Sequence, residues 1–570
     1  MFDLVHESFA KHGDRLFLEE TGGVLIVPEA FLKKKTQKKR QFLFSKGQRV
    51  LKVVKQIVFG EIKQKDLEIR REDLSALVPQ LQRPASFSLT RDLPNEAVLL
   101  TEKTTVTLKN IAISVKLFFV LLEKTKITVC EKFSITEHAR NEDCIREHGM
   151  MEETPFCLVR NVAVSPLALE NIERMPKNSV GCSLRRFDLS DTGLINILPK
   201  LRIHEDSEVE MLSLSASEEA HVAGILAKDK SLSARRVKSM WLKEYAVGVV
   251  TKMSHEDCGV EYLTLHASRK EHVAGILKQD QPICVGRVNN MLIKEYAVGV
   301  VTKMSHEDCE VGNLTLHASR KAHVAAVLEQ DQPFCIGRVE RMWLWDCAAS
   351  ILPKLVIHKD SKVGWLYLSA AKEEHVAVAP KKDQTFCVER VKNMVLRNYA
   401  VSIFPKLRTH RDSVVESLEL SADREENVAA VLAQEKTSCV WRVKRMTISN
   451  YAVCVITKMT FHKDNIMVEF VLRGKPECFS RILKEGDGSI GLGRIRRGGF
   501  DVPERIRRKL GYDLVGRARN RRFVGENGRR RSRRRMGETD EEEITTSDGE
   551  TSWMDDEEES DEEEITASDG

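Results

Sequence analysis

The chain has 570 residues, of which 42% are hydrophobic and 31% are charged, and its formal net charge is +5. This composition is that of a globular protein, and the length allows several domains. The most apolar segment, residues 113–122, contains Lys116 and is far shorter than the roughly 20 residues that a spanning helix needs. Nothing therefore indicates a membrane protein, and we expect no membrane partner.

Residues 1–82 do not repeat, and we predict that they form a mostly helical N-terminal region. They contain a basic run at residues 33–40 (KKKTQKKR) and a helical-looking stretch at residues 50–61 (VLKVVKQIVFGE). The first fifteen residues carry acids and bases and lack the apolar core of a secretory signal. The thirteen cysteines include no CxxC pair and no cluster beside the repeats, which favours a reducing compartment. We therefore expect a cytoplasmic or nuclear protein.

The most informative feature is an internal copy: residues 243–258 (KEYAVGVVTKMSHEDC) recur unchanged at residues 294–309. Each 51-residue unit has two halves, and each half places apolar residues at positions one, four and six before a short helical stretch. One half reads Val237, Met240, Leu242 and then YAVGVVTKM. A strand and a helix of this length cannot bury their apolar faces alone, so neighbouring copies must stack into a solenoid with a continuous core.

The pattern resembles the leucine-rich repeat LxxLxLxxNxL, as in Leu184, Phe187, Leu189, Thr192 and Leu194. The alternation of long and short halves resembles the ribonuclease-inhibitor class, which the cytosolic NOD-like receptors also use. This resemblance implies an α/β solenoid with a parallel sheet on the concave face and helices on the convex face. The N-terminal region distantly resembles the segment that precedes the repeats in those receptors, although no GxxxxGK[ST] nucleotide-binding motif occurs.

The ninth repeat position departs from the family, because Tyr or Ser, as at Tyr245 and Ser268, stands where Asn or Cys is usual. The sequence therefore leaves open how the loops are hydrogen-bonded. We place an array of about fifteen repeats at residues 83–470. Its predicted second apolar positions are Phe87, Ile111, Phe133, Val162, Phe187, Leu212, Met240, Leu263, Met291, Leu314, Met342, Leu366, Met394, Leu418 and Met446.

After the array we predict a Gly/Arg-rich basic linker at residues 471–536 and an acidic disordered tail at residues 537–570. Residues 494–536 hold 17 Lys and Arg against four acids, and residues 537–570 hold 17 acids and no base. Gly486, Gly488 and Gly491 match GxGxxG, but no βαβ unit surrounds them, so we interpret them as a flexible linker. The run RRRSRRR at residues 529–535 could bind nucleic acid or another polyanion, direct nuclear import, or pair with the acidic tail.

The candidate binding site is aromatic. Side chains between the apolar strand positions should point to the concave face, where large aromatics mark binding surfaces. The six aromatic residues at such positions are Trp241, Tyr262, Trp343, Trp345, Trp365 and Tyr367. Trp343 and Tyr367 should lie side by side on adjacent strands, about 4.8 Å apart. The alternative is that bulky residues only fill a tightly curved face.

The recurring His-x-Asp, as at His255 and Asp257, invites a metal-site interpretation, but we predict a structural turn because copies lie roughly 10 Å apart on alternate strands. No nucleophile, base and acid can be singled out, so we expect no enzyme activity, no cofactor and no metal. The sequence predicts a non-enzymatic recognition protein that binds a protein partner on the concave face. The family resemblance implies a role in innate sensing. The alternative is a nuclear or nucleic-acid-associated regulator that uses the charged tail.

Overall fold

The computed structural model describes residues 8–20, 22–28, 81–137, 142–149, 155–203, 208–227, 237–253, 259–304, 309–356, 363–376, 386–387, 391–408, 414–434, 438–440, 442–462 and 464–516. The chain divides into two compact units, Met1–Arg517 and Ala518–Gly570, and every described residue lies in the first. The basic run at residues 33–40 and the acidic segment 537–570 lie outside the described residues.

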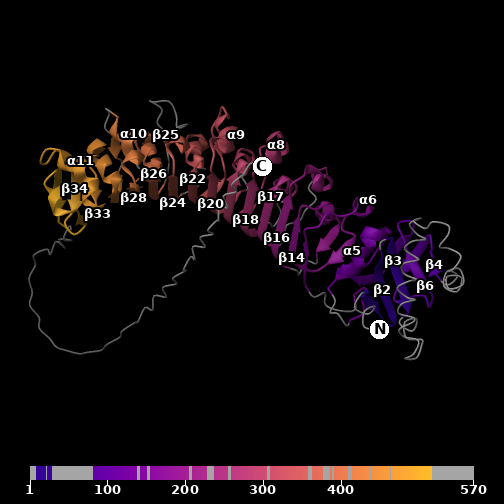
Figure 1. The fold of residues 1–570 in the computed structure, drawn as a ribbon. Helices are drawn as coiled ribbons and strands as arrows, with labels where there is room; N and C mark the ends of the chain where they lie inside the picture. Colours follow the sequence, from indigo (N-terminus) through magenta and orange to yellow (C-terminus); the bar gives the residue numbers. More distant parts are fainter. Residues whose placement is uncertain are drawn as a thin grey trace, which may run out of the picture. The chain divides into compact units, whose positions relative to one another are not determined.

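The centre of the first unit is one parallel sheet of 14 strands, so the solenoid-like α/β architecture is confirmed (Figure 1). In spatial order the strands are β12 (Phe156–Arg160), β14 (Leu184–Ser190), β16 (Val209–Ala216), β17 (Val237–Glu244), β18 (Gly259–Ala267), β19 (Arg287–Glu295), β20 (Glu310–Ala318), β22 (Arg338–Asp346), β24 (Trp365–Ala370), β26 (Asn393–Asn398), β28 (Val414–Ala422), β30 (Arg442–Asn450), β33 (Glu469–Arg473) and β35 (Phe500–Asp501).

The register of this sheet follows the apolar repeat from Phe187 onward. Met240 pairs with Leu263, Leu263 with Met291, and the same ladder continues through Met446 to Phe470. These side chains, and those two residues further along each strand, point into the core, where Met342 is 2% exposed. The predicted second apolar positions from Phe187 to Met446 are thus confirmed as one ladder.

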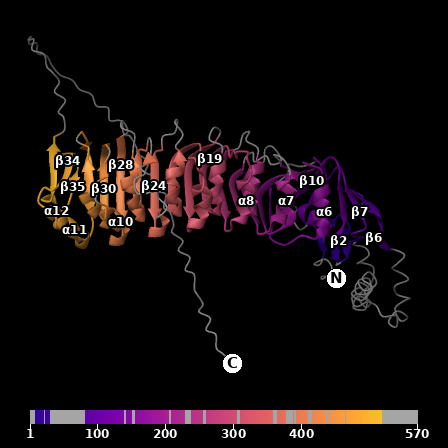
Figure 2. The ribbon, with the colours of Figure 1, turned by 90° about the horizontal axis from the view of Figure 1, so that it is seen from above.

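The C-terminal ends of the strands lead into short helical segments that line one side of the sheet (Figures 1 and 2). Long halves continue into eight-residue 3-10 helices, which are η3 (Gly193–Lys200), η5 (Tyr245–Lys252), η6 (Tyr296–Lys303), η8 (Cys347–Lys354), η10 (Tyr399–Lys406) and η12 (Tyr451–Lys458). Short halves continue into 3-10 turns and brief helices, which are η4 (Glu219–His221), α7 (Ala223–Leu226), α8 (Glu271–Leu277), η7 (Lys321–Val324), α9 (Ala325–Leu328), η9 (Glu373–His375), η11 (Glu425–Val428), α10 (Ala429–Leu432), η13 (Pro476–Phe479) and α11 (Ser480–Leu483). Among the described residues, no helix has both the length and the apolar character required to cross a bilayer.

The corner after each long half resolves the hydrogen bonding that the ninth position left open. The eighth residue adopts a left-handed backbone, with φ of 58° at Glu244 and 56° at Asp346. Its side chain accepts the backbone N–H of the next short half: Ser268 donates to Glu244 at 3.0 Å, and Ala371 to Asp346 at 3.1 Å. A corner carboxylate or amide therefore links successive halves in place of an asparagine at position nine.

Four cysteines at one repeat position, Cys182, Cys335, Cys387 and Cys439, fall in short strands that pair with another short strand outside the main sheet. These pairs are β13 (Val180–Cys182) with β15 (Leu201–Ile203), β21 (Phe334–Cys335) with β23 (Leu355–Val356), β25 (Phe386–Cys387) with β27 (Leu407–Arg408), and β29 (Ser438–Val440) with β31 (Met459–Phe461). Cys284, which recurs at the same repeat position, is 5% exposed and packs as a small buried hydrophobe, whereas Cys335 is half-buried.

The start of the chain differs from the prediction. A mostly helical region is wrong for residues 8–20 and 22–28, which form β1 (Ser8–His12), β2 (Arg15–Glu20) and β3 (Gly23–Pro28), an antiparallel meander. These strands share a sheet with β6 (Ala97–Leu100) and β4 (Leu81–Gln82). Short continuous apolar runs at residues 16–18 and 24–27, on either side of Gly22 and Gly23, are typical of buried strands.

The first three predicted repeats are also wrong as members of the central sheet, and the fourth joins it with another residue in the core position. Phe87 lies in a sheet of β5 (Ser86–Leu89), β7 (Thr105–Leu108) and β9 (Lys126–Val129). Ile111 and Phe133 lie in another sheet, which joins β8 (Ile111–Ser114), β10 (Phe133–Thr136) and β11 (Ile145–Glu147) to β13 and β15, beside helices α5 (Val115–Lys124) and α6 (Pro166–Arg174). Val162 is 62% exposed, and Leu158 takes its place opposite Phe187.

The C-terminal boundary is wrong as well, because the fold continues to residue 516. Strands β32 (Ile466–Met467), β34 (Ile490–Arg496) and β36 (Leu510–Val515) form a parallel sheet, and α12 (Glu504–Arg507) precedes the last strand. The predicted linker glycines belong to this folded end, where Gly491 lies inside β34. A Cβ at Gly499 would stand 1.8 Å from the Val468 carbonyl oxygen, so close strand approach requires glycine there.

Candidate functional site

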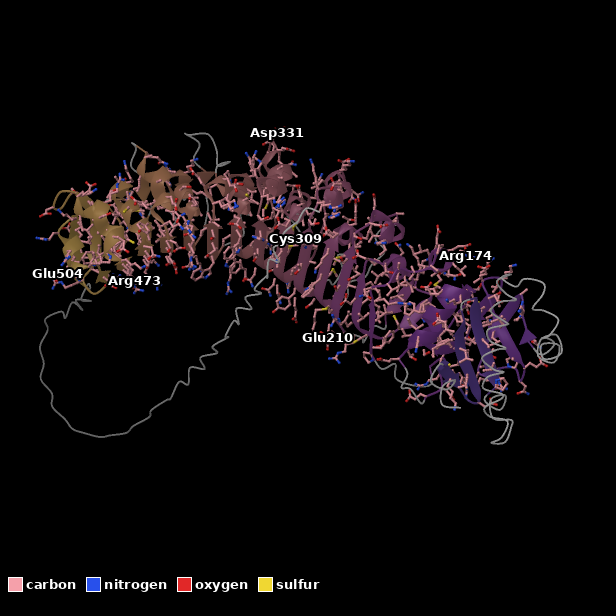
Figure 3. All side chains as sticks on the ribbon, in the orientation of Figure 1. Arg174, Glu210, Cys309, Asp331, Arg473 and Glu504 are labelled. Atoms are coloured by element: carbon pink, nitrogen blue, oxygen red, sulfur yellow. The ribbon has the colours of Figure 1, made fainter. Side chains whose placement is uncertain are left out.

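The candidate site is the sheet face that no helical segment of the described residues lines, which we call the open face. It consists of the side chains that alternate with the core ladder, which in β17 are Ser239, Trp241 and Lys243. In Figure 3 the labelled Glu210 and Arg473 project on the strand side, whereas Asp331 projects on the helical side. All six predicted aromatic residues lie at such open-face positions.

Four of these residues, Trp343, Trp345, Trp365 and Tyr367, lie together on β22 and β24 and form what we call the aromatic cluster. Trp343 pairs directly with Tyr367, as the sequence predicts, and the ring centroids of Trp345 and Tyr367 are 5.0 Å apart at a tilt of 41°. Trp365 is 45% exposed and Trp345 38% exposed, while Trp343 and Tyr367 are half-buried. The half-buried rings of Trp343 and Tyr367 therefore lie among the more exposed rings of Trp345 and Trp365.

The aromatic cluster continues into β26 through one cation. The Arg397 guanidinium carbon lies 5.4 Å from the centre of the Tyr367 ring, and Arg397 also pairs with Glu419 at 3.6 Å. Burial raises the pKa of the Tyr367 phenol, so this group stays neutral in water near pH 7. Val395, next to Tyr367 on the same row, is only 6% exposed although it points away from the core. The cluster thus shields apolar area on its own face.

Trp241 and Tyr262 lie apart from the cluster. Trp241 pairs with Thr264, and Tyr262 pairs with Ser239, so the two rings are diagonal neighbours on β17 and β18, with exposed fractions of 40% and 51%. Three strand steps separate β18 from β22, which corresponds to about 14 Å. The structure therefore divides the six predicted residues into a cluster of four and a separate pair.

The predicted His-x-Asp pairs, from His255 and Asp257 onward, lie outside the described residues. Within the described part of the chain, no group of three His, Cys, Asp or Glu side chains could hold a metal ion. A different histidine series, which sequence reasoning missed, is buried beside the corner residues: His272 contacts Glu244, His323 contacts Glu295, and His375 lies 3.0 Å from Asp346. These histidines recur at intervals of 51 and 52 residues, so the same repeat period that defines the array would have indicated them from the sequence.

These histidines fulfil a role in the fold. The backbone N–H of Arg320 donates to Nδ1 of His323 at 3.2 Å, and two units later the backbone N–H of Arg424 donates to Oδ1 of Asn427 at 2.9 Å. Asn replaces His at the same position without loss of the hydrogen bond. His272 and His323 therefore close the turns at the start of their helical segments, and the open face is the stronger candidate for function.

Comparison with known proteins adds no identity: no family, no curated protein and no solved structure matches this chain.

Proposed function

We propose that this chain is a non-enzymatic recognition protein of the leucine-rich-repeat type, which binds a protein partner on its open face. The observation that carries the proposal is the aromatic cluster, which leaves Trp345 and Trp365 partly exposed. Side chains at these strand positions point away from the core, so the fold itself does not require large aromatic residues there. Large, rigid aromatics carry a disproportionate share of binding energy in protein interfaces.

The size of the open face supports a partner of ordinary dimensions. From β17 to β30 the sheet has nine strands, which span about 38 Å at 4.8 Å per step. With about 20 Å of each strand on display, the face offers roughly 750 Å², close to the ~800 Å² that each partner contributes to a standard interface. Resemblance to the repeats of NOD-like receptors makes recognition in innate sensing the first context to examine, although this fold serves many partners.

The test compares a Trp343→Ala/Trp365→Ala variant with the wild-type chain and with a control variant, Leu169→Ala/Leu483→Ala, whose residues are exposed on helices α6 and α11 (40% and 42%). Partners captured by the wild-type chain would be purified and measured one to one by calorimetry. We expect the double Trp variant to lose at least thirtyfold in affinity, about 2 kcal/mol, while the control binds normally. Equal binding by all three proteins would contradict the proposal.

A second candidate function, nucleic-acid or polyanion binding, is favoured by the folded C-terminal end. Five arginines there are exposed on or next to β34 and α12: Arg496, Arg497, Arg505, Arg507 and Arg508. They precede the arginine-rich run at residues 529–535. Binding through such residues must weaken steeply with salt, since it releases condensed counterions. A titration of duplex DNA at 0.05 and 0.15 M salt, with the five arginines changed to Ser, would test it.

A further inference from the structure

The open face between β17 and β30 is basic as well as aromatic. Of the side chains at its three exposed rows, five are Lys or Arg and one is acidic. The cations are Lys243, Lys294, Arg341, Arg397 and Arg445, and the acid is Glu419. His266 and His317 lie on the same rows, and Nε2 of His317 lies 3.3 Å from the Asp346 carboxylate. The acid is already occupied, because Glu419 pairs with Arg397 at 3.6 Å.

The unpaired cations lie in register with the aromatic cluster. One row of paired residues runs from Lys243 through His266, Lys294 and His317 to Trp345. Arg341 stands directly opposite Trp365 on the neighbouring strand. Lys243, Lys294 and Arg341 form no ion pair within the part of the chain that the structure describes. Fold stability therefore does not account for their charge.

We infer that the partner segment recognised by the open face is an extended acidic peptide that carries a large apolar side chain. The inference rests on the proposed function and names its ligand class. Successive anchors along the row, Lys243, Lys294 and Trp345, are two strands apart, about 10 Å. Residues three apart in an extended chain are also separated by about 10 Å. Two acids and one apolar residue at intervals of three would meet the two lysines and the aromatic cluster in turn.

The charge density favours a peptide over a nucleic acid. Five cations along about 38 Å of sheet correspond to one in roughly 8 Å, whereas duplex DNA carries one phosphate charge per ~1.7 Å of axis. A nucleic-acid track would need more cations on these rows than the sequence provides. An acidic peptide with spaced carboxylates matches the lysines without excess repulsion, and its apolar side chain can bury against Trp345 and Trp365.

The probe is a fluorescent synthetic peptide with the sequence of residues 555–567 (DDEEESDEEEITA), in which Glu559, Glu562 and Ile565 have the required spacing. The host is the full-length chain with the 17 acidic residues of its segment 537–570 changed to the corresponding amides, so that its own acids cannot compete. Binding is followed by fluorescence polarisation at 0.05 and 0.15 M salt, and circular dichroism verifies that each variant is folded.

We expect Lys243→Glu/Lys294→Glu/Arg341→Glu to weaken peptide binding at least tenfold, and Ile565→Ser in the peptide to weaken it several-fold. The matched control, Lys270→Glu/Lys278→Glu/Lys321→Glu, reverses three exposed charges on the helical side and should leave binding nearly unchanged. Equal loss in both triple variants would mean diffuse attraction and would overturn the inference. So would absence of peptide binding to the host.

Two further outcomes separate this inference from the proposed function. If the open-face charge reversal abolishes binding of an oligothymidine probe of equal charge that binds more tightly than the peptide, the ligand class is nucleic acid and the inference is wrong. If captured protein partners depend on Trp343 and Trp365 but ignore the charge reversal, the proposed function stands and the acidic ligand class falls. If binding depends neither on Trp343 and Trp365 nor on the open-face charges, both the proposed function and the acidic ligand class are wrong.

Discussion

Replacing Met342 by Asp should unfold the array locally. Met342 is 2% exposed in β22, between Leu314 on one side and Leu366 on the other. Removing the buried thioether side chain costs about 2 kcal/mol in lost burial alone. The new carboxyl must also stay neutral at pH 7, about three units above its usual pKa, which costs about 4 kcal/mol more. We expect a total near 6 kcal/mol, a large fraction of a domain's stability.

Urea unfolding followed by circular dichroism at pH 7 and pH 5 measures this loss. Because the penalty comes from protonation, it should shrink at pH 5 by up to about 1.4 kcal/mol per pH unit. Arg341→Asp, one residue away on the open face, is the control and should change stability by less than about 1 kcal/mol. Similar losses in the two variants would show that the strand register is wrong by one residue.

Three other outcomes follow from the repeat, the histidine series and the thiols. Deleting residues 243–293, one whole unit, restores the same sequence at the junction and should leave a folded array with an unfolding slope about a tenth smaller, whereas deleting 12 residues inside it should not fold. Burial lowers the pKa of His323, so the unfolded chain binds this proton more readily and stability should fall as pH drops below 6.5; His323→Asn, which copies Asn427, should flatten that dependence in urea titrations. Burial raises the pKa of Cys144 to about 12, so alkylation at pH 8 should modify exposed Cys157 quickly and Cys144 only after unfolding.

The central ladder could be predicted because the chain repeats itself. Two identical stretches of sixteen residues must adopt one structure in one environment, and that fixes the unit length. Once the length of the repeat unit is known, Met240 and Leu263 mark the same core position in its two halves, and every later core position follows by adding one unit. Side-chain alternation then assigns Trp343 to the face opposite Met342 without further information.

The ends could not be predicted in this way, because no copy of them exists. At β12 both Leu158 and Val162 are apolar candidates for one core position, and only packing against Phe187 selects Leu158. At the C-terminal end, glycine content suggested a linker. The buried Ile490, Leu492 and Ile495 of β34 nevertheless carried a strand pattern within the same segment. Composition outweighed periodicity in that interpretation, and periodicity was the better guide.

The charges of the open face were equally visible in the sequence but had no meaning before the register was known. Lys243 and Lys294 are one repeat apart, and only the pairing of β17 to β22 shows that both lie on the row that reaches Trp345. Strand pairing creates many such neighbours, because residues about 25 apart in sequence come to lie about 5 Å apart on adjacent strands.

Burial differs among the four clustered rings, and this difference distinguishes binding from the alternative that bulky residues merely fill the face. Tyr367 is half-buried, contacts Trp345 and Arg397, and adjoins buried Val395, so Tyr367→Ala should cost both stability and binding. Trp365 is 45% exposed, so Trp365→Ala should cost binding with little change in the midpoint of unfolding. Parallel calorimetry and urea titrations of the two variants would show this asymmetry. If Trp365→Ala destabilises the chain as much as Tyr367→Ala does, the rings act as one packed layer and the partner binds elsewhere.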